Sequence, residues 1–142
     1  MSRVKLSIPS EYGYDKIPRA VIETLASEMG FSPEYISDIK TAITEILIPI
    51  IATNYRALRA DIPIDITFII KTKALIIKVI EQNPTPEFPD IPIIGQDPTP
   101  QIPVPYLVPE LADKVETSAT PEGSEIEVTF YIDDNQNTGG KQ

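Results

Sequence analysis

The residues of this sequence that are able to do chemistry are mainly carboxylates, because the chain contains no cysteine and no histidine. The absence of cysteine and histidine excludes disulfides, thiol nucleophiles, imidazole acid/base catalysis and histidine-ligated zinc. Acidic residues gather in a stretch without lysine or arginine, between residues 79 and 113: Glu81, Glu87, Asp90, Asp97, Glu110 and Asp113. Clustered carboxylates suit Ca²⁺, but no Asp-x-Asp-x-Asp-Gly loop is present. We therefore interpret these residues as solvated loop charges.

A second group of polar side chains follows helical spacing after residue 32. Ser32-Pro33-Glu34 is a typical helix start, with a serine N-cap, a proline in the first turn and an acid near the positive end of the dipole. One face of this helix is apolar and the opposite face carries polar residues: Ile36, Ile39, Ile43, Ile46, Leu47 and Ile50 against Asp38, Thr41 and Glu45. The pattern extends to about Tyr55, but Pro49 predicts a kink or an early end.

The remaining elements must position these side chains. Alternation predicts strands over 4–8, 64–71, 75–81, 115–119 and 126–132, and helical spacing predicts a first helix from Tyr14 to Met29, ended by Gly30. A short helix fits within 106–114. Helices between antiparallel hairpins predict an α+β fold, a two-layer sandwich with helices on one face of a mixed, mostly antiparallel sheet.

Prolines divide the chain of 142 residues. Nine of the 15 prolines lie between Pro84 and Pro109. We expect one domain over 1–132, with a proline-rich, lid-like loop over 83–106 and a disordered tail over 133–142. The apolar residues of this loop are expected to fold back over a cavity beside the sheet: Phe88, Ile91, Ile93, Ile94, Ile102, Val104 and Tyr106.

The charge of the chain bears on its partners. Its 12 basic and 21 acidic residues give a net charge of −9, which disfavours binding to nucleic acid or to an anionic membrane. No apolar run reaches the length of about 20 residues that a membrane span requires. The N-terminus has no apolar core typical of a signal peptide. We therefore expect a cytoplasmic protein.

Three segments resemble bacterial anti-sigma-factor serine kinases, which belong to the histidine-kinase-like (GHKL) ATPase superfamily. The segments are 38–45, read as DIKTAITE; 111–115, read as LADKV; and 121–128, read as PEGSEIEV. The resemblance covers residues 3–132 in the same order. It implies the histidine-kinase-like ATPase fold and three motifs that bind Mg-ATP.

Each family motif is altered at the matching positions. Glu45 occupies the position of the general base, but Pro49 occupies that of the magnesium-binding Asn. Gln82 stands where an Asp reads adenine, although Glu81 supplies an acid in a register shifted by one. The glycines that approach the nucleotide are replaced by Pro84, Pro86, Pro103 and Pro105. Proline has no N–H to donate to a phosphate, so we expect a degraded ATP site and no bound cofactor.

The resemblance also implies a partner. Family members grip a sigma factor or an antagonist protein through the first strand and the first two helices, and the matching surface here includes Tyr14, Arg19 and Glu23. They dimerise, so the resemblance also implies a homodimer. Our hypothesis is a regulatory, protein-binding module that no longer phosphorylates. The alternatives are an ATP-binding protein-serine kinase with a divergent site that uses Glu45, and a redesigned version of the scaffold.

Overall fold

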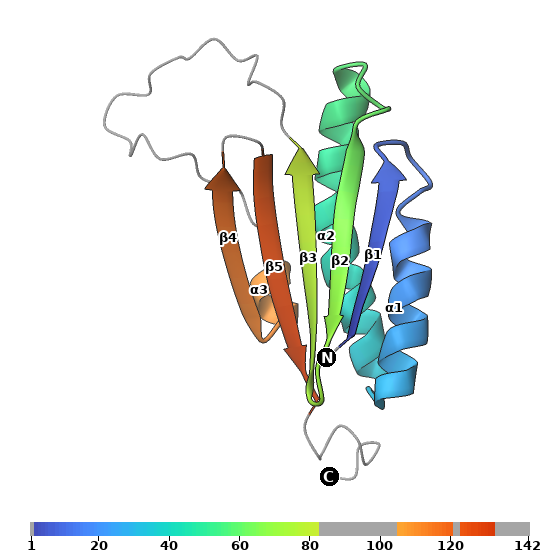
Figure 1. The fold of residues 1–142 in the computed structure, drawn as a ribbon, viewed down its shortest axis with the longest axis vertical. Helices are drawn as coiled ribbons and strands as arrows, with labels where there is room; N and C mark the ends of the chain where they lie inside the picture. The colour runs from blue at the N-terminus through green and yellow to red at the C-terminus, as the bar shows by residue number, and fades with distance from the viewer. Residues whose placement is uncertain (1, 83–104, 121–122, 133–142) are drawn as a thin grey trace, which may run out of the picture.

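The protein has one antiparallel sheet and three helices in the computed structural model, which describes residues 2–82, 105–120 and 123–132. The order is β1 (Ser2–Pro9), α1 (Lys16–Met29), α2 (Pro33–Arg56), β2 (Pro63–Ile70), β3 (Ala74–Gln82), α3 (Val108–Leu111), β4 (Lys114–Thr120) and β5 (Gly123–Tyr131). The strands lie side by side in the order β1-β2-β3-β5-β4 (Figure 1). Every pairing between them is antiparallel, so the expectation of a mixed sheet was wrong in that detail.

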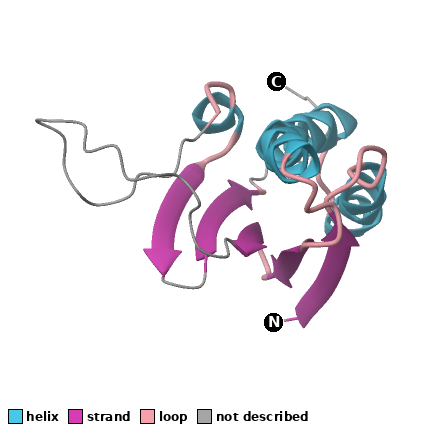
Figure 2. Ribbon diagram, turned by 90° about the horizontal axis from the view of Figure 1, so that it is seen from above, coloured by secondary structure: helices cyan, strands magenta, loops and turns pink. Residues whose placement is uncertain are grey.

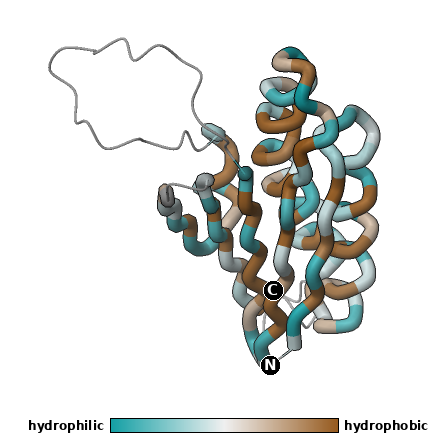
Figure 3. Tube along the Cα trace, turned by 45° about the horizontal axis from the view of Figure 1, so that its top comes forward, coloured by the Kyte–Doolittle hydropathy of each residue, from teal (hydrophilic) through white to brown (hydrophobic). Residues whose placement is uncertain are grey.

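The helices lie on one face of the sheet (Figure 2). The two long helices cover β1, β2 and β3, whereas the short α3 lies near β4 and β5 (Figures 1 and 2). Hydrophobic and hydrophilic residues alternate along the strands (Figure 3), and apolar residues of β1, β2, β3 and β5 face the helix layer, among them Ile8, Ile66, Leu75 and Val128. This two-layer α+β arrangement confirms the fold class predicted from the sequence.

The core forms where α2 crosses the sheet. Its largest fully buried side chains come from both helices and from all strands but β4: Phe68, Phe130, Ile8, Ile22, Ile39, Ile43, Ile46, Leu47, Ile51, Ile64, Ile66 and Leu75. Apolar residues of β2, β3 and β5 on the helix face point into it, including Ile66, Ile77 and Val128. The buried surface is therefore concentrated beneath the two long helices.

The ends of the helices follow the signals in the sequence. Gly30 ends α1 in a left-handed conformation with φ 98°, and its N–H bonds the carbonyl groups of Ala26 and Ser27. The side chain of Ser32 accepts a hydrogen bond from the Tyr35 N–H, as expected of an N-cap.

Pro49 does not end α2, so the expectation of an early end was wrong. The helix continues for seven residues beyond it, to Arg56. Pro49 lies on the exposed side of the helix, where water can reach the Glu45 carbonyl that a residue with an N–H would have bonded. The neighbouring Ile46, Leu47 and Ile50 are buried, and this packing holds the helix together across the proline.

Two expectations fall wholly or largely outside the described residues. They are the conformation of the proline-rich loop, of which only 105 and 106 are described, and the disordered tail over 133–142. Tyr106 is 83% exposed, so the expectation that this residue is buried was wrong. Within the described ranges, no helix has the length and apolar character to cross a membrane.

Candidate functional site

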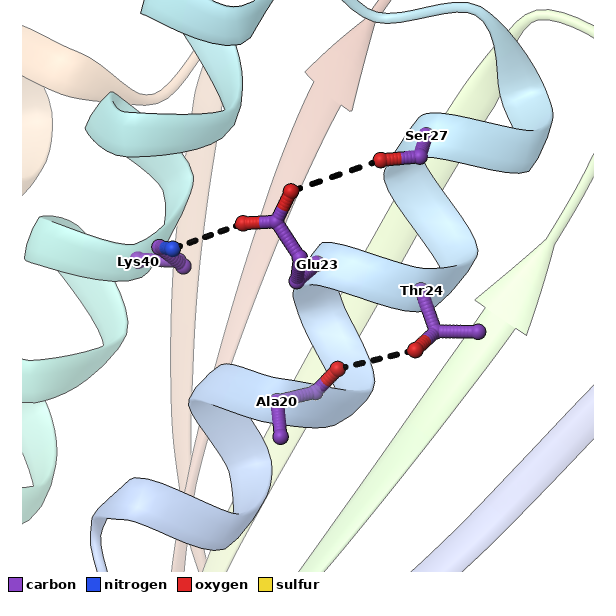
Figure 4. A network of polar contacts seen from close by, with 5 residues as sticks. All are labelled: Ala20, Glu23, Thr24, Ser27 and Lys40. Atoms are coloured by element: carbon purple, nitrogen blue, oxygen red, sulfur yellow. Dashed lines mark hydrogen bonds and ion pairs between the residues drawn. The ribbon is translucent and has the colours of Figure 1, made fainter.

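The face formed by α1 and α2 brings opposite charges together. The Glu23 carboxylate on α1 accepts a hydrogen bond of 2.7 Å from Lys40 Nζ on α2, and the Ser27 hydroxyl donates to its other oxygen (Figure 4). Lys40 lowers the pKa of Glu23, because the ammonium group stabilises the charged carboxylate. The Glu23 end of this bridge is exposed, so a partner can exchange it for contacts of its own.

A polar pocket of about 440 Å³ lies beside this bridge. It is lined by Arg19 from α1 and by five residues of α2: Ser37, Lys40, Thr41, Thr44 and Glu45. Arg19 is paired with Asp15 one turn earlier, at 3.4 Å. We name this surface the α1–α2 groove: the six lining residues together with Glu23. Its mixed charges and hydroxyl groups suit the polar side chains of a partner.

Some of the site residues predicted from the sequence lie in this groove, and others lie outside it. Arg19, Glu23 and Glu45 belong to the α1–α2 groove, and Tyr14 is 40% exposed in the turn that precedes α1. Pro49 lies on α2 one turn after Glu45 and offers no side-chain oxygen to a metal ion. Among the described residues, no group of three or more Asp, Glu, His or Cys side chains is placed to hold a metal.

The end of β3 places Glu81 and Gln82 on opposite faces of the sheet. Glu81 is two residues after the buried Val79, so its side chain shares the face covered by the helices. Gln82 points to the other face, where its Nε2 donates to Asp65 Oδ2 at 3.3 Å. Of Glu81 and Gln82, only Glu81 therefore has its side chain on the face of the sheet that the helices cover.

Burial raises the pKa of the Glu81 carboxyl above its ordinary value. The residue is half-buried at the edge of the core, so the expectation of a solvated loop charge was wrong for it. Gly123 on β5 lies opposite Gln82, and a Cβ atom at Gly123 would come within 2.2 Å of the Glu81 carbonyl oxygen. Glycine therefore allows the close approach of β3 and β5 at this end of the sheet.

The four prolines that stand at the positions of the family's motif glycines are only partly described. Pro84, Pro86 and Pro103 lie outside the described residues. Pro105 is half-buried, and its carbonyl accepts a hydrogen bond of 3.0 Å from the Val108 N–H at the start of α3. The backbone carbonyl of Pro105 is therefore engaged in a hydrogen bond at the start of α3.

Sequence reasoning missed a polar tie between α2 and the start of β4. The Tyr35 hydroxyl donates to Asp113 Oδ2, and the same carboxylate oxygen accepts the Tyr131 N–H at 2.7 Å. Burial and the Asp113 carboxylate raise the pKa of Tyr35 above its ordinary value. Asp113 thus accepts two hydrogen bonds while the residue stays exposed, as expected of a solvated charge. The signal available was Tyr35 itself, one turn before Ile39 on the buried stripe, because a buried hydroxyl needs a partner.

A scan of the sequence against protein families finds no match, and a search of curated proteins finds no similar sequence. The structure is similar to the crystal structure of the RsbU and RsbW domains of Rv1364c from Mycobacterium tuberculosis, with a TM-score of 0.67 and 13% sequence identity. The match covers 93% of this chain and 32% of that chain, so this chain spans about a third of its length. The likeness establishes the fold: the chain has the histidine-kinase-like ATPase fold expected from the sequence.

Proposed function

We propose that the protein is a regulatory module of the anti-sigma type, which acts by binding another protein through the α1–α2 groove. The observation that carries the proposal is the placement of Arg19, Glu23 and Lys40 on one accessible face. Fold similarity to a structure that contains an RsbW domain supports a regulatory partner of the sigma-factor or antagonist class.

We propose further that this module does not use ATP, and therefore carries no cofactor. Three features support this: Pro49 at the position of the family's metal ligand, Gln82 turned to the far face of the sheet, and proline at the positions of the glycines in both of the family's glycine motifs. The residues at these positions do not fit Mg-ATP, because they lack the metal-binding oxygen and the backbone donors that phosphates need.

Copurification from the native host tests the partner. A tagged wild-type chain should recover a sigma factor or an antagonist, and Arg19→Glu combined with Glu23→Lys should lose it, because both charges of the groove are reversed. The matched control is Lys114→Glu, whose exposed ion pair with Glu116 lies on β4. Recovery of no regulatory protein, or equal losses in both variants, would contradict the proposal.

A second candidate function is an ATP-dependent protein-serine kinase with a divergent site. Glu81 favours it, because a half-buried carboxylate on the helix face at the end of β3 is placed to accept a hydrogen bond from a ligand. Calorimetric titration with Mg-ATP separates the two functions. A silent titration supports the protein-binding module, whereas micromolar affinity that is lost in Glu81→Gln supports the kinase.

A homodimer and a cytoplasmic location stay predictions for this protein. Sedimentation over a range of concentrations measures the first, and fractionation of the native host measures the second. A species of twice 15.7 kDa is the expected mass of the dimer.

A further inference from the structure

The outer edge of β4 is an open strand edge. β4 is the last strand on its side of the sheet, and no strand among the described residues pairs with its outer edge (Figure 1). An unpaired edge presents N–H and C=O groups to any other strand that fits it. The ladder to β5 runs along β4 from Lys114 to Thr120, which holds the strand extended. The edge is therefore preformed for a further strand.

The two charged residues of β4 share one face of the sheet. Val115 lies opposite the buried Val128 of β5 and so points to the face that the helices cover. Lys114 and Glu116, on either side of Val115, point to the far face, where their side chains are 57% and 59% exposed. Their charged groups are 3.9 Å apart, and an exposed ion pair of this kind contributes little to stability. Both charges therefore remain available to a partner.

Glu116 has an unfavourable neighbour in the isolated chain. The ladder places it directly opposite Glu127 of β5, and like charges in this position destabilise an antiparallel pair. Glu127 has a cation on its other side, because Lys78 Nζ of β3 lies 3.8 Å from its carboxylate. A cation on the outer side of Glu116 would give each of the two carboxylates a positive neighbour in the same row.

We infer that a second copy of this chain supplies that cation, with the two β4 strands paired antiparallel about Val115. This inference gives the homodimer expected from the sequence a specific interface. In this register Lys114 of each copy lies directly opposite Glu116 of the other, and the two Val115 side chains meet on the helix face. Directly opposed Cβ atoms are about 4.5–5.5 Å apart and diagonal ones about 7–8 Å, so each charge is closest to charges of opposite sign.

Other antiparallel registers of the same two strands lack this complementarity. Pairing about Glu116 would oppose the two Glu116 carboxylates. Pairing about Thr117 would place each Glu116 opposite Ser118, without an ion pair. Val115 is therefore the centre that the charges of the strand favour.

The remaining carboxylates near this edge are compatible with the register about Val115. Asp113 is exposed at the start of β4 and would lie opposite Thr117 of the second copy, so it meets no like charge. Glu110 is exposed on α3, which belongs to the helix layer, whereas Lys114 and Glu116 are on the far face. Neither residue stands in the row of the proposed ion pairs.

The edge strand on the opposite side of the sheet does not offer the same contact. β1 carries two cations, Arg3 and Lys5, and no carboxylate, so two copies of β1 cannot form ion pairs with each other. Pro9 at its end has no N–H to donate. Pairing of β1 with β4 of another copy would leave an open edge on each side and continue into an array, whereas pairing of β4 with β4 closes.

The pairing also covers a groove beside β4. This groove has a volume of about 430 Å³ and lies next to α3, and it is lined by Pro109, Ala112, Asp113, Lys114, Val115 and Thr117. Val115 is half-buried in the single chain. Because the two-fold axis passes by Val115, the grooves of the two copies meet there and each gains cover from the other.

Sedimentation of the full chain over about 1–1,000 µM tests the proposal. The contact is one short strand pair, so we expect a dimer with a Kd of about 10–100 µM. Lys114→Glu and Glu116→Lys each place like charges opposite one another and should weaken the dimer at least about tenfold. Combining the two substitutions in one chain restores both ion pairs and should restore the dimer. Mixing the two single variants should also restore it, as a heterodimer.

The matched control is Lys5→Glu, which makes the same charge change on the other edge strand and should leave the dimer unchanged. Circular dichroism checks that all variants fold as the wild type does. A monomer at every concentration, equal losses in Lys114→Glu and Lys5→Glu, or no recovery in either the double variant or the mixture would each overturn the proposal.

The outcome is independent of partner binding through the α1–α2 groove. The groove lies on the helices that cover β1, β2 and β3, and each copy carries its own. Lys114→Glu should therefore lose the dimer and keep the partner, whereas Arg19→Glu combined with Glu23→Lys should lose the partner and keep the dimer.

Discussion

The two ends of the sheet, one formed by β1 to β3 and the other by β4, are covered very differently by helices. Under α1 and α2, the inward-facing Ile64, Ile66 and Phe68 of β2 are fully buried. On β4, which has only the four-residue α3 near it, the residues of the same face are half-buried at Val115 and exposed at Thr117. The register places these two residues opposite Val128 and Ile126, so they face the helix layer without being covered by it.

This difference divides the molecule into a packed region and a tied region. The packed region is β1, β2, β3, α1 and α2. The tied region is α3 and β4, which joins the rest through the buried Val108, the ladder to β5 and the contacts of Asp113 with Tyr35 and Tyr131. Regions with few buried apolar contacts open at lower free energy, so β4 and α3 should unfold locally before the core.

The largest expected effect comes from emptying the packed region. Phe68→Ala should lower the free energy of unfolding by about 3–5 kcal/mol, because the side chain is fully buried and leaves a cavity. Val115→Ala in the tied region should lower it by no more than about 1 kcal/mol. Urea denaturation followed by circular dichroism measures both. Similar losses in the two variants would mean that β4 contributes to the core as strongly as β2 does.

A gain of stability is expected within the packed region at Pro49. Pro49→Ala restores a donor to the Glu45 carbonyl in the middle of α2, and should raise the free energy of unfolding by up to about 3 kcal/mol. The control is Pro33→Ala: this proline is in the first turn, where it interrupts no helical hydrogen bond. The interpretation of α2 as a helix held across a proline fails if both variants have the same stability.

The sequence predicts the packed region well because its signals are local. Apolar spacing and the caps at Gly30 and Ser32 locate α1 and α2, and alternation locates the strands. The continuation of α2 past Pro49 depends on how tightly Ile46 and Ile50 pack against the sheet, which the spacing of prolines does not reveal. Local rules therefore predicted the element but not its tolerance of the proline.

The site residues show the same limit. Strand parity, counted from Val79, was sufficient to place Glu81 on the helix face and Gln82 on the other, so this part of the site could be read from the sequence. The contact between Tyr35 and Asp113 joins residues 78 positions apart, and no local pattern encodes such a pairing. Only the folded chain brings the charges of the α1–α2 groove within reach of one another.

A smaller effect is expected from cutting the tie between the two regions. Tyr35→Phe removes the hydroxyl that donates to Asp113 and should lower the free energy of unfolding by about 1–2 kcal/mol. Hydrogen exchange should become faster in β4 and at the Tyr131 N–H, while the core amides of β2 keep their protection. The control is Tyr131→Phe, because that side chain is exposed. A uniform increase in exchange over the whole sheet would contradict the division into two regions.

The same tyrosine predicts a dependence on alkaline pH. Because folding raises the pKa of Tyr35, its neutral form stabilises the protein fully below the ordinary tyrosine pKa of about 10. This contribution is lost as the pH rises further, since the unfolded chain ionises first. Wild type should lose stability above about pH 10 more steeply than Tyr35→Phe does. Parallel pH profiles for the two proteins would show that the hydroxyl does not sit in a buried tie.

The smallest effect is expected at Glu81, which lies at the border of the packed region. Burial raises its pKa above the ordinary value for a glutamate, so its contribution to stability is fully present below that ordinary value and falls as the pH rises through the folded pKa. Glu81→Gln removes the charge and should therefore be slightly more stable than wild type at pH 7, with the difference shrinking at pH 4. Thermal unfolding at both pH values measures this, and Glu110→Gln on exposed α3 is the control. A loss of stability at pH 7 in Glu81→Gln would mean that the carboxylate is stabilised by a cation or donor, and that the end of β3 belongs to a polar site instead of the rim of an apolar core.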